Sequence, residues 1–107
     1  MFVSIDLHGS AQPELAEPTA FDAFKVVVDG EAAGDRAAVA DALAACGWLD
    51  ESGDAFVSID RLLELAGDHA ASQEWRAQFE QMVAFARKHG WLDESGAAIR
   101  AHIEYLG

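Results

Sequence analysis

The chain has 107 residues, 51% of them hydrophobic, which is enough for one domain with its own core and too few for two ordinary domains. Seven basic residues against nineteen acidic ones give a net charge of −12, which repels phosphate backbones and anionic lipids. We therefore expect neither nucleic acid nor a membrane as a partner. The single cysteine, Cys46, excludes an internal disulfide and, together with an N-terminus unlike a signal peptide, favours the cytoplasm.

The first twenty residues predict one strand followed by a connector. Residues 2–8 alternate apolar and polar side chains, which is the period of a half-buried strand. Residues 9–20 contain both prolines of the chain, Pro13 and Pro18, and are expected to be irregular. The compact core of this single domain is then built by residues 21–107.

A second strand and a first helix are expected next. Residues 24–28 are rich in valine and precede the turn dipeptide Asp29-Gly30. A helix over residues 35–46 can be capped by Asp35 and ended by Gly47 in a left-handed conformation. Its apolar stripe consists of Val39, Ala42, Leu43 and Cys46, so Cys46 is interpreted as a buried thiol of the core.

The middle of the chain predicts a hairpin and a short helix. Residues 48–49 and 56–59 look extended and flank a polar turn, which favours a hairpin. Either Ser58 or Asp60 can cap a short helix that Gly67 closes.

The longest predicted helix covers residues 72–89 and ends at Gly90. Residues 91–105 are expected to form a second hairpin, because the side chains from Ile99 onward alternate again. The inner face of the helix is predicted to carry Trp75, Phe79, Met82, Val83 and Ala86.

The heptapeptide Gly-Trp-Leu-Asp-Glu-Ser-Gly occurs twice, at 47–53 and at 90–96, so the two copies are 43 residues apart. We interpret each copy as a helix stop, a hydrophobic clamp made by Trp48 or Trp91, and a polar hairpin turn. The alternative is an exposed binding surface made by Trp48, Leu49, Trp91 and Leu92.

These elements predict an α+β fold with about three helices, two short hairpins and an N-terminal strand. From residue 35 to 105 their order resembles a winged helix, with residues 91–105 in the place of the wing. In DNA-binding members of that class the long helix enters the major groove. Here that helix begins with Gln73 and Glu74 and has no basic cluster, so the resemblance implies a protein-contact use of the fold.

Two carboxylate and imidazole pairs are the candidates for metal binding or acid–base chemistry. Asp6 and His8 stand two apart on one predicted strand, and His102 and Glu104 stand two apart on another. If the two strands were neighbours, the four groups would lie together and could bind a divalent metal or transfer a proton. The alternative is that they are ordinary side chains on wet faces of edge strands.

The sequence favours a non-catalytic protein-interaction module, accessory or regulatory, that binds a protein partner or itself. We expect no cofactor, because nucleotide-binding glycine patterns and nucleophile motifs are missing from the sequence. One alternative is a small enzyme or metal-binding protein that uses Asp6, His8, His102 and Glu104. Another is an acidic inhibitor that mimics nucleic acid.

Overall fold

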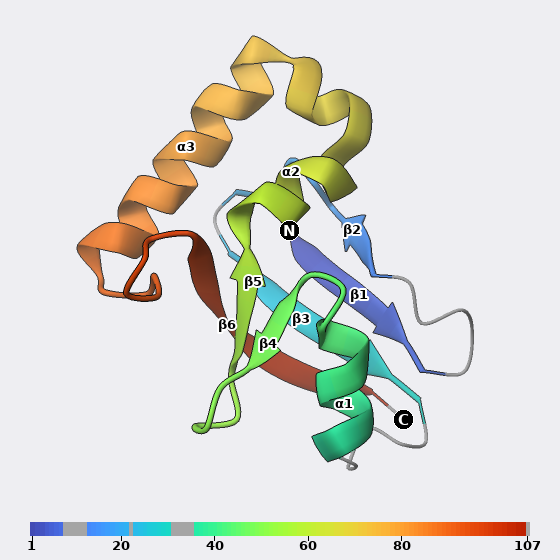
Figure 1. Ribbon diagram of the computed structural model, residues 1–107. Coiled ribbons are helices and arrows are strands. Elements are labelled where there is room, and N and C mark those ends of the chain that lie inside the picture. Colours follow the sequence, from blue (N-terminus) through green and yellow to red (C-terminus); the bar gives the residue numbers. More distant parts are fainter. Residues whose placement is uncertain (8–12, 22, 31–35, 107) are drawn as a thin grey trace.

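The computed structural model of the chain describes residues 1–7, 13–21, 23–30 and 36–106, and it has one six-stranded sheet and several helices (Figure 1). The strands are β1 (Phe2–Asp6), β2 (Glu14–Ala16), β3 (Lys25–Asp29), β4 (Gly47–Leu49), β5 (Ala55–Ser58) and β6 (Ala98–Leu106). The helices are α1 (Arg36–Leu43), α2 (Ile59–Ala66), the 3₁₀ helix η2 (Gly67–Ala71) and α3 (Gln73–Lys88). The expected α+β class is therefore confirmed.

The strands are arranged in the order β2-β1-β3-β6-β5-β4. The three strands β1, β3 and β6 run parallel, whereas the pairs β1–β2, β5–β6 and β4–β5 are antiparallel. The first half of β6 pairs with β5 and its second half pairs with β3. The last strand of the chain thus joins the N-terminal strands to the β4–β5 hairpin.

The winged-helix resemblance is not confirmed. Residues 91–105, expected as a wing, contain most of β6, which lies inside the sheet with neighbours on both sides. Of the hairpin predicted over these residues, only a single bridge between Leu92 and Ile99 is formed. The physical reason lies in β3, where Val26, Val27 and Val28 are all buried. The backbone N–H and C=O groups of a buried strand need hydrogen-bond partners on both edges, and β6 supplies them on one edge of β3.

The connector predicted over residues 9–20 is partly wrong, because Glu14–Ala16 forms the short edge strand β2 against β1. Three residues between two prolines are too few to show a strand period, so the local pattern did not indicate it. The start of that connector, residues 8–12, and the predicted cap Asp35 lie outside the described residues.

The core lies between one face of the sheet and the helices. Val3, Val26 and Ile103 are directly opposite one another on three adjacent strands, and each is almost fully buried. Buried side chains of the helices pack against this face, namely Val39, Leu43, Leu62, Trp75, Phe79 and Ala86. Within the described residues, no helix is long and apolar enough to cross a membrane.

Cys46 belongs to this core, as predicted, with 2% of its surface exposed. Burial raises the pKa of its thiol, and the positive charge of Arg61 lowers it by less. The thiol is therefore held in the neutral form, which is the form that suits an apolar core.

Two helices have a serine at the N-cap position. The hydroxyl of Ser58 accepts from the N–H of Arg61 at the start of α2, and that of Ser72 accepts from the N–H of Trp75 at the start of α3. The predicted cap at Ser58 is confirmed. Each such cap contributes about 1 kcal/mol, because it satisfies an N–H group that the helix leaves without a partner.

Gly90 ends α3 as predicted, whereas Gly47 does not end α1. Gly90 has φ +74, its N–H donates to the carbonyl of Arg87, and the N–H of Trp91 donates to that of Ala86, which is a Schellman motif. Gly47 is instead the first residue of β4 and directly follows the three-residue turn after α1. The same heptapeptide thus begins in two different local structures.

Candidate functional site

Strand register places four side chains in one line across the solvent-facing side of the sheet. Trp48 on β4 is opposite Phe56 on β5, and Phe56 is opposite Arg100 on β6. The N–H of Arg100 donates to the carbonyl of Trp91 at 2.6 Å, so Trp91 continues the line beyond β6. Because directly paired residues share a face, Trp48, Phe56, Arg100 and Trp91 form what is called below the aromatic row.

Phe56 is enclosed by its two neighbours in the aromatic row. The rings of Trp48 and Phe56 are stacked with centroids 5.3 Å apart, and the guanidinium of Arg100 lies 5.3 Å from the Phe56 centroid. Phe56 is consequently only 8% exposed although it lies on the outer face. Such aromatic pairs and cation–π contacts contribute about 0.5–1.5 kcal/mol each, which fixes the side chains in place before any partner binds.

The other end of the aromatic row packs on the end of α3. Trp91 stacks on His89 at 4.9 Å between ring centroids, and its edge meets Phe85 at 5.7 Å. The predicted clamp of a helix end is therefore confirmed for Trp91. It is wrong for Trp48, which packs across the sheet on Phe56, because the chain before it turns into β4 rather than closing α1.

The two tryptophans keep a large exposed surface, 45% for Trp48 and 44% for Trp91. Leu49 and Leu92, predicted to join them at the surface, are half-buried and pack against the core. The alternation of a strand explains the difference, since consecutive residues point to opposite faces. The structure thus leaves the tryptophans, and not the leucines, as the exposed hydrophobic side chains of each repeat.

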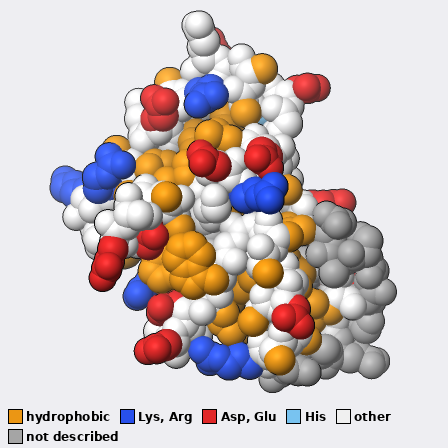
Figure 2. Space-filling view, in the orientation of Figure 1, with side chains coloured by type: hydrophobic (Ala, Val, Ile, Leu, Met, Phe, Trp, Pro, Cys, Tyr) orange, Lys and Arg blue, Asp and Glu red, His pale blue; other side chains and the backbone are white. Residues whose placement is uncertain are grey.

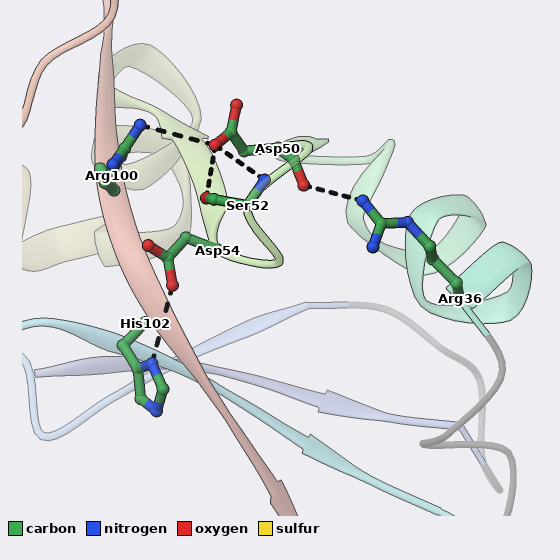
Figure 3. Close-up of polar contacts among 6 residues, drawn as sticks. All are labelled: Arg36, Asp50, Ser52, Asp54, Arg100 and His102. Atoms are coloured by element: carbon green, nitrogen blue, oxygen red, sulfur yellow. Dashed lines mark hydrogen bonds and ion pairs between the residues drawn. The ribbon is translucent and has the colours of Figure 1, made fainter.

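A polar rim borders the middle of the aromatic row, and its side chains come from β6 and from the β4–β5 turn (Figure 3). Arg100 Nη2 lies 3.5 Å from Asp50 Oδ2, and His102 Nδ1 lies 3.7 Å from Asp54 Oδ1. Hydrogen bonds from the side chain and backbone of Ser52, with a smaller contribution from Arg100, lower the pKa of Asp50. Asp50 therefore stays ionised beside the cation in the row.

The predicted carboxylate and imidazole cluster is not assembled as the hypothesis required. Asp6 lies on β1 and Glu104 on β6, and β3 separates these strands. Glu104 forms an ion pair with Lys25 at 2.5 Å, and the hydrogen bond and charge of Lys25 lower the pKa of its carboxyl group. His8 is outside the described residues, within which no group of three His, Cys, Asp or Glu side chains could hold a metal ion.

Three members of this surface were not singled out from the sequence: Phe56, Phe85 and Arg100. They join the tryptophans only through strand register and the packing of α3, which a local pattern does not encode. Compared with known proteins, the chain matches no family, no curated protein and no solved structure.

Proposed function

We propose that the protein is a non-catalytic interaction module that binds another protein through the aromatic row. The observation that carries this proposal is the pair of exposed indoles, Trp48 and Trp91, held at the two ends of one ordered line of side chains. Tryptophan and arginine are the residues most enriched among binding hot spots, and rigid side chains lose little entropy on binding. The cytoplasm is the compartment we propose, because the single cysteine, Cys46, is free and disulfides are rare in that compartment.

Charge supports a partner that presents basic residues around an apolar contact. Asp50 and Asp54 border the aromatic row, and the two turns of the repeats add Glu51 and Glu94 as exposed carboxylates. With a net charge of −12, the molecule attracts cationic surfaces and steers their approach.

Two other functions are supported less well by the geometry. On the side seen in Figure 2, acidic side chains are interspersed with lysines and arginines around exposed hydrophobic ones, which differs from the continuous acidic track of a nucleic-acid mimic. The metal-binding alternative would need Asp6 to reach His102 across β3, and strand spacing of about 4.8 Å sets them about 10 Å apart sideways alone.

The proposal predicts that Trp48 and Trp91 are both required for binding. Tagged wild-type protein and the variants Trp48→Ala and Trp91→Ala are used to capture proteins from lysate of the source cells, and retained proteins are quantified by mass spectrometry. At least one protein should be retained by the wild type and reduced about tenfold or more by each variant, since hot-spot truncations cost about 2 kcal/mol.

The matched control is Leu106→Ala, which removes an equally exposed side chain, 45%, outside the aromatic row. Circular dichroism and sedimentation establish that all variants are folded and report whether the retained partner is a second copy of the chain. Equal retention by the wild type and both tryptophan variants would contradict the proposal.

A further inference from the structure

A line of hollows runs beside α3 and ends at the aromatic row. One wall is a stripe of α3 that carries Glu74, Gln78, Met82 and Phe85, and the other wall contains Phe21 and Phe24. We call this the α3 groove. Of the residues that line these hollows, only Trp91 and the start of α3 were considered as binding residues from the sequence.

Shared lining residues show that the hollows are neighbours. Phe21 lines three of them in succession, and Phe85 lines two. Trp91 and Arg100 then line both the hollow under the end of α3 and the next one, which opens beside Asp54 and His102. From Glu74 to Phe85 the helix rises by about 16 Å, so the α3 groove is at least that long.

We propose that the α3 groove binds an extended, apolar segment of a protein partner, with a lysine or arginine at the end that meets Glu74. This rests on the proposed function and names the partner segment for it. The hollow next to Trp91 has a volume of about 90 Å³, which suits one small apolar side chain.

Hydrogen-bonding groups favour an extended segment over a helix. An extended backbone leaves its N–H and C=O groups without internal partners, whereas a helix satisfies its own. Gln78 and Gln81 both line the groove, are exposed, and offer amide donors and acceptors. Phe21 and Phe85 supply apolar contacts between these polar groups.

Charge fixes the orientation of the segment. Glu74 lines one end of the α3 groove, and the exposed carboxylates Glu17 and Asp68 stand within two residues of the lining residues Thr19 and His69. The other end contains Arg100, whose charge is paired with Asp50 at 3.5 Å. A segment with its basic residue at the Glu74 end meets opposite charge there, because none of the carboxylates at that end forms an ion pair with another described residue.

The probe is a phage-displayed library of random twelve-residue peptides, selected on the immobilised wild-type protein. We expect the enriched peptides to contain spaced apolar residues and a lysine or arginine at one end. The strongest is synthesised with a fluorescent label, and its affinity is measured by anisotropy. Protein labelled at the methionine methyl groups should show a shift of the Met82 methyl resonance on addition of the peptide, with Met82→Leu used for assignment.

Charge reversals on two flanks of α3 distinguish binding in the α3 groove from nonspecific electrostatic attraction to the acidic protein. Glu74→Lys should weaken binding about fivefold or more, because an exposed attraction becomes a repulsion. Glu80→Lys, an equal change of net charge on the flank of α3 away from the groove, should alter the affinity less than about twofold. Urea unfolding of both variants establishes that each is folded under the assay conditions.

Enrichment of basic, apolar peptides, a Met82 shift and selective loss in Glu74→Lys together support the proposal. Absence of enrichment, equal effects of the two reversals or an unchanged Met82 resonance would each overturn the α3 groove as the site. None of these three results bears on whether a partner is captured through Trp48 and Trp91. A negative result for the α3 groove is therefore distinguishable from a negative result for the proposed function.

Discussion

Gly47 and Gly90 begin identical heptapeptides and are needed for different physical reasons. A Cβ added at Gly47 would lie 1.8 Å from the carbonyl oxygen of Phe56, in the backbone of the neighbouring strand. Gly90 has open space around that position, and its requirement is the left-handed backbone at φ +74. One position therefore demands the absence of a side chain, and the other demands a backbone that side chains disfavour.

The two substitutions to alanine should differ in cost. Gly47→Ala forces β4 away from β5 and should lower the free energy of unfolding by about 3 kcal/mol or more. Gly90→Ala strains only its own backbone and should cost about 1–2 kcal/mol. Urea titration followed by tryptophan fluorescence measures both, and an equal or reversed order would contradict this account of Gly47.

At the scale of elements, the predictable parts are those whose signal is local. The alternation in β1, the valines of β3, the amphipathic stripe of α3 and the β4–β5 hairpin were all correctly predicted. The short strand β2 and the central position of β6 were not, because parallel pairing of β3 with β6 joins segments from opposite ends of the chain. The aromatic row follows from that pairing, so only its tryptophans were visible in the sequence.

The turn before β6 is stabilised by the carboxylate of Asp93. Burial of this group, the largest single influence, raises its pKa, but hydrogen bonds from Ser95, Ala98 and Ala97 together outweigh it, so the pKa is lowered. The Asp93 Oδ1 atom accepts from the N–H groups of Ala97 and Ala98 at 3.0 and 3.1 Å. These bonds fix the point at which the chain enters β6.

Asp93→Asn should therefore change how stability depends on pH. A carboxyl group with a lowered pKa stabilises the fold fully above its unfolded pKa of about 3.9 and loses that contribution as the pH falls through the folded value. The difference in unfolding free energy between the wild type and Asp93→Asn should shrink from pH 6 to pH 2.5. Glu94→Gln, which removes the adjacent charge, is the matched control, and a difference that grows on acidification would refute the role of Asp93.

At the scale of the whole molecule, the net charge of −12 is distributed over a body of 38 × 28 × 19 Å. At about 10 mM salt the screening length is about 30 Å, so nearly every carboxylate repels every other; at about 0.1 M it is about 10 Å and only neighbours interact. Among the described residues, three exposed ion pairs of lysine or arginine oppose this repulsion: Lys25–Glu104, Arg61–Glu64 and Arg100–Asp50. Such exposed pairs contribute little to stability, and nineteen acidic residues face only seven basic ones.

Repulsion should therefore dominate, and raising NaCl from about 10 mM to about 200 mM should increase the free energy of unfolding, because screening relieves the folded state more than the expanded chain. The same increase in salt should weaken binding of a basic peptide, so stability and affinity should move in opposite directions. Urea titrations and anisotropy at matched salt concentrations measure the two quantities, and KCl in place of NaCl tests for a specific effect of sodium. A fall in unfolding free energy with salt would mean that the exposed ion pairs outweigh the repulsion among the carboxylates.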